Sequence, residues 1–189
     1  MSCQICNSND HTTFLSKVSL IYGTEYDLVE CPECRIIFFS PLPTVDQLAA
    51  FYSAGYYDFD RWREEGKGMA FARQLNRLKP TGKFIDVGCA TGFFINGIKQ
   101  HSKWEVFGTD FGASAVRFAK EQLGLNVQQG DLADAKFPSE YFDYVHVNNV
   151  LEHVPNPIEL MTECKRILKP DGVFYLSVPN GAVDCRDII

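Results

Sequence analysis

The sequence has no uninterrupted apolar run approaching the roughly 20 residues that a membrane-spanning helix needs. Its first residues, Met1-Ser-Cys-Gln-Ile-Cys-Asn7, carry neither the positive charge nor the apolar stretch of a secretory signal peptide. Positive charge is not in excess either, since 24 acidic and 18 basic residues give a formal net charge of −6. We therefore expect no membrane span and no secretion, and the charge disfavours a nucleic-acid substrate.

Two close pairs of cysteines stand near the start of the chain, Cys3-x-x-Cys6 and Cys31-x-x-Cys34. This spacing places two thiolates on one tight turn, and two such turns complete a tetrahedral zinc site. A segment of roughly 40 residues buries too little apolar surface to fold alone, so a metal would supply the missing stability. Four cysteine ligands leave no open position, so we expect structural Zn²⁺. The alternatives are two disulfides or unpaired thiols, and His11 fits less well as a ligand.

Three further cysteines are scattered, at Cys89, Cys164 and Cys185. Odd, unpaired thiols suit a reducing compartment, so we expect a cytoplasmic protein. We interpret Cys89 as a small packing residue rather than a catalytic thiolate. With 46% hydrophobic and 13% aromatic residues, the chain can build one ordinary core and a small appendage.

The segment that contains the cysteine pairs predicts short strands, as in a zinc ribbon. Proline cannot extend a strand ladder, so Pro41-Leu42-Pro43 should end the last of them. The predicted strands are Thr13–Leu15, Tyr26–Glu30 and Ile36–Phe39.

Two helices are predicted next. Thr44 can cap a helix over residues 45–53. Tyr56 and Tyr57 follow; they either cover a bound ligand or simply dock the helices on the core. The second helix spans Gly68–Leu78, with one apolar face made of Phe71, Leu75 and Leu78.

A short buried strand, a glycine turn and the opening of a helix follow one another between Phe84 and Phe94. Gly88 and Gly92 let the backbone come close to a ligand. A second strand, from residue 104 to 109, is followed by Asp110, about 20 residues after the turn. An acidic residue at this place can accept hydrogen bonds from both hydroxyls of an adenosine ribose. Strands over 126–128 and 142–147 lead into Asp131 and Asn148.

Helices alternate with these strands, which predicts a doubly wound α/β sheet. Ser114 can cap a helix that ends at Gly124, and Pro157 starts another. A fifth strand spans residues 173–178, and residues 181–189 are too few for two more strands. The helix after Pro157 has an apolar core stripe of Leu160, Met161, Cys164, Ile167 and Leu168.

From about Thr81 to Asn180 the chain resembles the class I S-adenosylmethionine-dependent methyltransferases. Asp86-Val-Gly-Cys-Ala-Thr-Gly92 is similar to the first motif of that family, and Leu168-Lys-Pro-Asp-Gly172 resembles the turn before its fifth strand. The family often has glycine where this chain has Ala90, the mildest replacement. The turn lacks the Gly-x-Gly-x-x-Gly of dinucleotide enzymes, which favours S-adenosylmethionine over NAD.

The resemblance implies a binding site for the cofactor S-adenosylmethionine. In it Asp110 would bind the ribose, Asp131 with Leu132 would flank the adenine, and Asn148 would lie beside the methionine. Asp86 would orient the turn, with water or the amino group as its partner. The cofactor-binding residues would be Asp86, Gly88, Ala90, Gly92, Phe93, Asp110, Phe111, Asp131, Leu132 and Asn148.

Glu152-His153 is the only constellation that suggests acid–base chemistry. His153 titrates near neutrality, so it can accept a proton from the methyl acceptor as a catalytic base. Alternatively, it braces the loop before Pro155, with Glu152 solvated or paired. Asn149-x-x-Glu152-His153 also resembles the metal-binding pattern of small-RNA 2′-O-methyltransferases. Two of that pattern's ligand positions are absent, so we predict no catalytic metal.

The predicted fold class is α/β, a Rossmann-like doubly wound sheet without the last two strands of the family, preceded by a zinc ribbon. We expect a zinc-ribbon-like domain at 1–40, a helical linker or lid at 41–80 and a C-terminally incomplete methyltransferase core at 81–189. Ribbon-bearing members of the family often act on glycans, sugar nucleotides or natural products, which implies a small-molecule methyl acceptor such as a sugar or sugar nucleotide. The alternatives are a non-catalytic binding module and an RNA methyltransferase. The atom methylated and the oligomeric state stay open.

Overall fold

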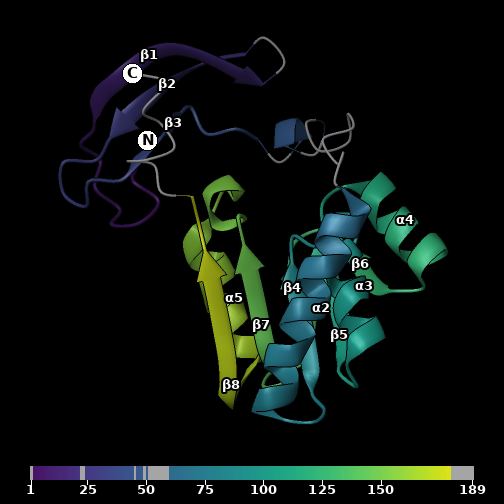
Figure 1. Cartoon of the computed structure of the whole chain (residues 1–189). Coiled ribbons are helices and arrows are strands. Elements are labelled where there is room, and N and C mark those ends of the chain that lie inside the picture. The colour runs from purple at the N-terminus through teal and green to yellow at the C-terminus, as the bar shows by residue number, and fades with distance from the viewer. Residues whose placement is uncertain (1, 22–23, 45, 49, 51–59, 180–189) are drawn as a thin grey trace.

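The computed structural model of the chain describes residues 2–21, 24–44, 46–48, 50 and 60–179. Strands in this part form two sheets, a small antiparallel one and a larger parallel one (Figure 1). No helix among these residues is long and apolar enough to cross a bilayer.

The antiparallel sheet contains β1 (Thr12–Ile21), β2 (Thr24–Glu30) and β3 (Ile37–Ser40), in that order. β1 is longer than the strand predicted from the sequence. β3 stops at Ser40, directly before Pro41, as predicted. Beneath the sheet lies a small core of Cys3, Val29, Cys31 and Phe38. Two of its four buried members, Cys3 and Cys31, are candidate metal ligands, so the packing of this core depends on the position of the cysteine cluster.

Thr44 caps the short helical stretch that follows. Its hydroxyl accepts a hydrogen bond from Gln47 N (3.2 Å), and its own N–H donates to Gln47 Oε1 (2.8 Å). This reciprocal pair is a capping box. Asp46–Leu48 are helical. Most of the predicted 45–53 helix, together with Tyr56 and Tyr57, lies outside the described residues.

α2 (Arg61–Leu78) begins seven residues before the predicted start, because Asp60 caps it by accepting hydrogen bonds from Trp62 N and Arg63 N. The predicted apolar face was wrong at Leu78, which is 57% exposed. The buried stripe runs through Gly68, Ala72 and Leu75. The next position in that 3.6-residue repeat is 79, so Leu78, in the last turn, lies at the edge of the stripe.

α2 crosses α3 (Phe93–His101) at two glycines. A Cβ on Gly68 would lie 2.0 Å from the carbonyl oxygen of Phe94, and one on Gly97 would lie 2.3 Å from that of Glu65. Beside this crossing the buried side chain of Asn96 donates to Glu65 Oε1 (2.7 Å). Asn76 of α2 also donates to the carbonyl oxygen of His101 in α3 (3.3 Å), so close backbone contact and polar bonds both join the two helices.

The parallel sheet has the strand order β6-β5-β4-β7-β8. From β4 the chain moves outward to β5 and β6, then returns to the other side of β4 for β7 and β8. This reversal places a topological switch point between β4 and β7, where ligands bind in doubly wound folds. The elements are β4 (Lys83–Val87), β5 (Glu105–Asp110), α4 (Ala113–Leu123), β6 (Asn126–Gln129), β7 (Phe142–Asn148), a 3₁₀ turn η1 (Leu151–His153), α5 (Pro157–Ile167) and β8 (Leu168–Ser177).

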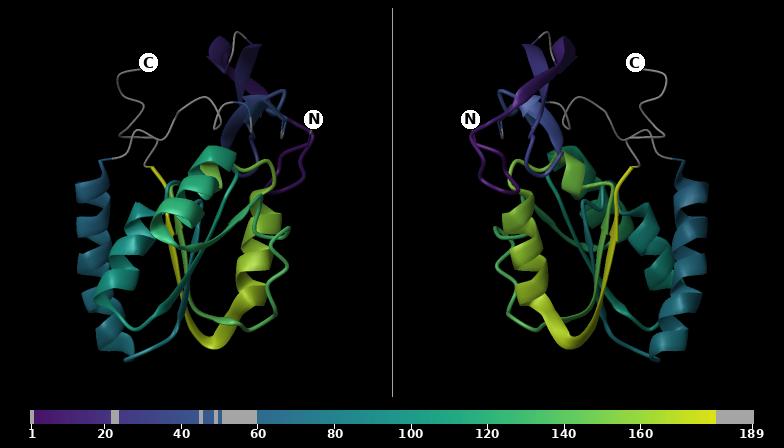
Figure 2. Two further views of the ribbon diagram at one scale, coloured as in Figure 1. Left: turned by 90° about the vertical axis from the view of Figure 1, so that its right-hand side faces the viewer. Right: turned by 90° about the vertical axis from the view of Figure 1, so that its left-hand side faces the viewer.

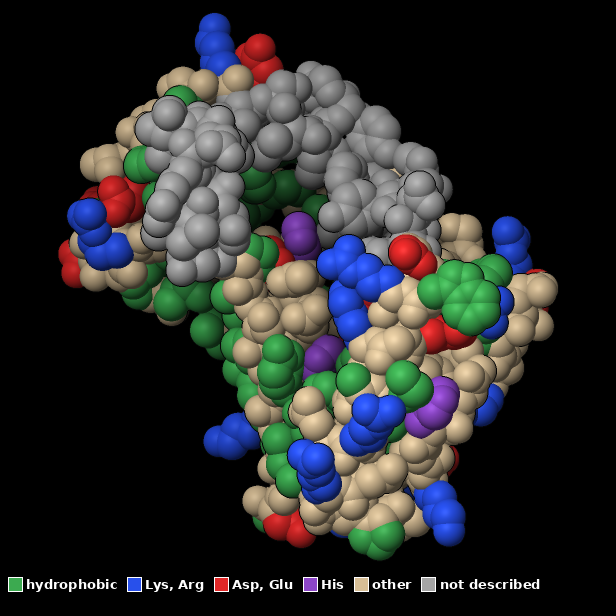
Figure 3. Space-filling view, in the orientation of Figure 1, with side chains coloured by type: hydrophobic (Ala, Val, Ile, Leu, Met, Phe, Trp, Pro, Cys, Tyr) green, Lys and Arg blue, Asp and Glu red, His purple; other side chains and the backbone are tan. Residues whose placement is uncertain are grey.

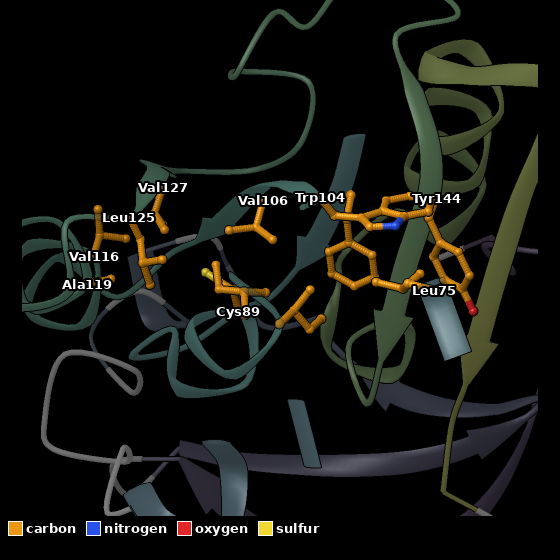
Figure 4. Packing of buried hydrophobic residues seen from close by; sticks show 12 residues of the cluster. Leu75, Cys89, Trp104, Val106, Val116, Ala119, Leu125, Val127 and Tyr144 are labelled. Carbon is orange, nitrogen blue, oxygen red and sulfur yellow. The ribbon is translucent and has the colours of Figure 1, made fainter. Parts of the chain in front are cut away.

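Helices cover both faces of this sheet: α2, α3 and α4 lie on one face and α5 on the other (Figure 2). The first face buries Phe84, Ile95, Ile98 and Val116, and Trp104 and Tyr144 pack in the same cluster (Figure 4). The second buries a separate cluster that includes Ile85, Val145, Cys164 and Ile167. The predicted Rossmann-like α/β fold with a small N-terminal sheet is confirmed.

Three local predictions fared differently. Gly124 ends α4 in the left-handed conformation, as predicted. Ser114 does not cap that helix, because the cap is Gly112, whose N–H donates to Asp110 Oδ1 (2.8 Å). The predicted turn over residues 168–172 lies inside β8, at an irregularity where pairing with β7 jumps from Leu168 to Val173.

Candidate active site

A cavity of about 500 Å³ lies at the carboxyl ends of the parallel strands. This volume is typical of small-molecule and cofactor pockets. The space-filling view shows a hollow at this end of the molecule, with histidine and basic side chains around it (Figure 3). The lining includes His153 and every sequence-predicted cofactor residue except Gly92. One cavity therefore brings together residues from the ends of β4, β5, β6 and β7.

The glycine turn after β4 is tied to β5 by backbone hydrogen bonds. The N–H groups of Gly88 and Cys89 both donate to the carbonyl oxygen of Thr109, at 2.8 and 3.0 Å. Gly88 has a φ of +74°, and a Cβ there would lie 2.4 Å from Val150 Cγ2. Only glycine suits both the left-handed backbone and the close approach of Val150.

Asp110 closes the turn from the other side. Its Oδ2 accepts a hydrogen bond from Ala90 N (2.8 Å), and its Oδ1 accepts the bond from Gly112. Ala90 has a φ of +49°, in the region that favours glycine, which explains the family's frequent glycine at this position.

Gly92 has a different place from the one expected. It caps α3 with a φ of +77°, is buried, and a Cβ there would lie 2.6 Å from Leu125 Cδ1. The turn and the packing against Leu125 require glycine here, and the residue lies outside the cavity lining. Phe93 and Phe111 line the cavity and are half-buried.

Asp131 and Leu132 follow β6 at the far end of the cavity. Asp131 is exposed and its Oδ1 accepts a hydrogen bond from Asp134 N (2.7 Å), which shapes the loop. Leu132 is 2% exposed and belongs to the core cluster on the α5 face while also lining the cavity. The pair offers an apolar wall and an acceptor at the same end.

Asn148 ends β7, and η1 follows with His153 at its last position. Both side chains line the cavity and are exposed. His153 Nε2 lies 3.6 Å from Glu152 Oε1, and the backbone N–H of His153 donates to the carbonyl oxygen of Val150 (2.9 Å). His153 is therefore held at the cavity by its backbone, with a carboxylate nearby.

The sequence analysis did not single out His146, which also lines the cavity. Its Nδ1 lies 2.7 Å from Asp86 Oδ1, and both side chains are 8% exposed. Oδ1 of Asp86 thus has a protein side chain as its partner, which the sequence analysis did not predict. The available signal was the position of one histidine within the predicted strand over residues 142–147.

Cys89 packs in the core beside this site. Burial, together with the nearby carboxylates of Asp86 and Asp110, raises the pKa of the Cys89 thiol well above its ordinary value. The thiol therefore stays protonated and behaves as a small apolar group, consistent with its interpretation as a packing residue.

The four N-terminal cysteines gather at one place, and their sulfur atoms all lie within 4.8 Å of one another. The Sγ atoms of Cys3 and Cys34 are 3.5 Å apart, as are those of Cys6 and Cys31. Around one zinc ion with Zn–S of about 2.3 Å, tetrahedral sulfurs lie about 3.8 Å apart. The donor set and its spacing fit one zinc ion.

The two cysteine turns have the same backbone structure. Asn7 N donates to Cys3 O (3.0 Å) and Arg35 N donates to Cys31 O (2.9 Å). Asn7 and Arg35 also share a left-handed φ, of 60° and 64°. Burial raises the pKa of the Cys3 thiol, but hydrogen bonds from the N–H groups of Cys6 and Ile5 and from the Cys34 thiol lower it to about 7. The hydrogen bonds of this turn therefore favour the thiolate form of Cys3, which is the form that binds a metal.

The first cysteine turn touches the loop of the candidate site. Gln4, between Cys3 and Cys6, donates a hydrogen bond from Nε2 to the carbonyl oxygen of Pro155, two residues after His153. The four-cysteine cluster and the rim of the cavity are therefore in contact.

Comparison with known proteins finds sequences and structures that are similar to this chain. Residues 85–176 match the family model described as methyltransferase domain. A ubiquinone biosynthesis O-methyltransferase of Haemophilus ducreyi is 34% identical over 108 residues, covering 52% of this chain and 45% of that protein. The chain spans about half the length of the curated relatives it matches.

Solved structures share the fold. An S-adenosylmethionine-dependent methyltransferase of Archaeoglobus fulgidus is similar with a TM-score of 0.54 and 22% identity, covering 69% of this chain and 58% of that one. The [4+2]-cyclase SpnF is similar with a TM-score of 0.58 and 19% identity, covering 70% and 59%. A cyclase on this fold shows that the fold alone does not determine the reaction.

Proposed function

We propose that this chain, whose residues 85–176 belong to the class I S-adenosylmethionine-dependent methyltransferase family, transfers a methyl group from S-adenosylmethionine to a small-molecule acceptor. The observation that carries the proposal is the row of carboxylates along the cavity. Asp86 lies in β4, Asp110 ends β5 and Asp131 follows β6, which are adjacent strands of the sheet. That row matches an extended ligand with polar groups at intervals.

The proposed roles follow the strand order. Asp131 and Leu132 flank the adenine, and Asp110 accepts hydrogen bonds from the ribose hydroxyls. The turn from Gly88 to Ala90 packs along the ribose and methionine, with Phe93 and Phe111 as apolar walls. Asn148 lies on the methionine side, at the end of β7.

S-adenosylmethionine, when bound, supplies a methyl group already activated for displacement by its positive sulfonium. The protein then has to hold the acceptor in line with that methyl group and remove a proton where the acceptor needs it. We propose His153 as the proton acceptor, because it lies at the cavity with an exposed ring and a carboxylate 3.6 Å away. Bracing of the loop before Pro155 is its alternative role.

For the acceptor we propose a sugar or sugar nucleotide, which rests on the resemblance to methyltransferases with an N-terminal zinc ribbon. A second candidate is an aromatic or quinone-like ring. Phe71, Phe94 and Tyr175 line the cavity, and the Haemophilus ducreyi relative is named for ubiquinone biosynthesis.

The four-cysteine cluster is proposed to hold one structural Zn²⁺, which would need reduced thiols and therefore suits the cytoplasm. We propose a division into a zinc ribbon (1–40), a linker (41–80) and a methyltransferase core (81–189). The close packing of α2 on α3 joins the second half of that linker to the core.

Two measurements test the proposed function. Calorimetry should detect binding of S-adenosylhomocysteine, the demethylated product, to the protein. Methyl-labelled cofactor should then transfer label to one member of a panel containing nucleotide-linked deoxysugars and phenols. Cofactor binding without transfer to any acceptor would favour the non-catalytic binding module. Transfer to RNA would favour the RNA methyltransferase.

A further inference from the structure

Asp86 and His146 form a buried pair that the proposed chemistry does not yet use. They are direct partners in the parallel pairing of β4 with β7, so their side chains leave the sheet on the same face. Asp86 Oδ1 and His146 Nδ1 are 2.7 Å apart. A carboxylate only accepts hydrogen bonds, so the shared proton is placed on Nδ1.

The imidazole ring of His146 contacts four aromatic rings. One of them, Phe84 of β4, lies at 5.8 Å and 34°, and the other three come from other elements. Tyr175 of β8 stacks on it with centroids 4.8 Å apart and an interplanar angle of 12°. Phe94 of α3 stacks at 5.1 Å and 27°, and Phe71 of α2 meets it edge-on at 5.4 Å and 69°. The ring is therefore held in one orientation, and its Nδ1 keeps one direction toward Asp86.

The position of the pair along the cavity indicates which part of a ligand it meets. If the proposed function holds, adenine and ribose occupy the ends of β6 and β5, beside Asp131 and Asp110. The methionine then extends toward β4 and β7, where Asp86 and His146 line the cavity. The amino-acid end of the cofactor carries an ammonium group, which an oriented carboxylate binds strongly.

We propose that His146 is a positioning residue for the cofactor. By donating from Nδ1 to Oδ1 of Asp86, it fixes the carboxylate so that Oδ2 accepts a hydrogen bond from the α-ammonium of the methionine moiety. His146 acts through Asp86 and does not take part in the transfer. The inference rests on the proposed function.

The test compares two ligands that share adenosine and its sulfur atom. S-adenosylhomocysteine carries the amino-acid group, and 5′-methylthioadenosine does not. His146→Leu places an apolar side chain among the four rings but removes the donor to Asp86. We expect it to weaken S-adenosylhomocysteine binding by roughly 10- to 100-fold, the range for a hydrogen bond to a charged group, and to leave 5′-methylthioadenosine binding within about twofold.

Two further variants sharpen the comparison. Asp86→Asn removes the charge that binds the ammonium, so it should lose the same selectivity as His146→Leu. Tyr144→Phe is the matched control, since Tyr144 lies on the same strand and the same face, is 7% exposed, and lies outside the cavity lining. It should keep the ratio of the two affinities.

The outcomes separate the inference from the proposed function. If His146→Leu leaves the ratio of the S-adenosylhomocysteine and 5′-methylthioadenosine affinities unchanged, the positioning role is overturned, while the proposed cofactor binding is not. A wild-type protein that binds neither ligand overturns the proposed function and the inference with it. If His146→Leu does not fold, His146→Gln supplies an amide donor and should retain most of the selectivity. Its complete loss in a folded His146→Gln would contradict the proposal.

Discussion

The backbone N–H of Ala90 donates a hydrogen bond of 2.8 Å to Oδ2 of Asp110. The residue expected to bind the ribose therefore also ties the glycine turn after β4 to the end of β5. Because Oδ1 of the same carboxylate accepts a hydrogen bond from the N–H of Gly112, the residue before α4, one side chain connects the ends of β4 and β5 to the start of α4. Binding and local structure are coupled at this position.

Asp110→Ala is expected to weaken S-adenosylhomocysteine binding by about 1.5–3 kcal/mol, the cost of hydrogen bonds to a charged group. It should also lower the melting temperature, because Ala90 and Gly112 lose their acceptor. Calorimetry and thermal unfolding measure the two effects. Asp110→Asn keeps one carbonyl acceptor and should lose less of both. Wild-type affinity in folded Asp110→Ala would refute the ribose assignment.

Elemental analysis of the protein should find about one zinc per chain. Cys31→Ser removes a buried sulfur of the cluster and should lose the metal and the fold of the small sheet with it. His11→Ala is the control, because His11 is the alternative ligand and is exposed. Zinc content should be unchanged in that variant. A small sheet that stays folded without metal would contradict the structural role.

His153→Ala should lower turnover by about 10²–10⁴-fold if His153 is the catalytic base. Affinity for S-adenosylhomocysteine should stay nearly constant, since the His153 ring is exposed and the variant keeps the backbone N–H that donates to the carbonyl oxygen of Val150. Stopped assays with the acceptor found in the labelling experiment give the rate. Glu152→Gln, which removes the neighbouring charge, should have a smaller effect. Joint loss of melting temperature and cofactor affinity in His153→Ala would instead indicate that it braces the loop.

Gly97→Ala should lower the free energy of unfolding by about 1–3 kcal/mol, because the new methyl group would meet the carbonyl oxygen of Glu65 and push α2 from α3. Gly66→Ala is a matched control in α2, where a Cβ has no neighbour within 4 Å. It should stabilise the protein by about 0.5–1 kcal/mol through helix propensity. Urea unfolding separates the two, and equal effects would contradict the close helix contact.

Asp143 should make stability depend on pH in the acid range. Burial by itself raises the pKa of the Asp143 carboxyl. Hydrogen bonds from Lys169, Lys79 and the N–H of Lys83 outweigh that effect, so the pKa falls from 3.8 to about 2. A depressed folded-state pKa contributes stability above about pH 4, and this contribution is lost as pH falls toward about 2. Because both lysines are about a third exposed, we expect about 1–2 kcal/mol.

The measurement is the difference in unfolding free energy between the wild type and Asp143→Asn. It should be present at pH 6 and shrink as the pH falls through that window. Asp171→Asn, at an exposed position, should leave stability unchanged at both ends. A constant difference across the window would mean that the ion pairs contribute little.

Much of the fold was predictable because it depends on local pattern. Alternating apolar strands, the turn from Gly88 to Gly92 and the helix stop at Gly124 each act over a few residues, and the structure has them where expected. The cysteine spacing likewise predicted four sulfurs at one place, and the cluster confirms that they meet. In these cases a residue's own backbone preference or its spacing along the chain is enough to determine the outcome.

Tertiary structure decided what depends on contacts between distant segments. The Asp86–His146 pair forms only because β7 lies beside β4 in a given register, 60 residues apart in sequence. Gly68 and Gly97 are required only because α2 and α3 cross there. Gly92 packs against Leu125 and does not line the cavity. Leu78 is exposed because it lies at the edge of the buried stripe of α2. Burial and hydrogen-bond partners follow from packing in three dimensions, and the linear order of residues does not contain them directly.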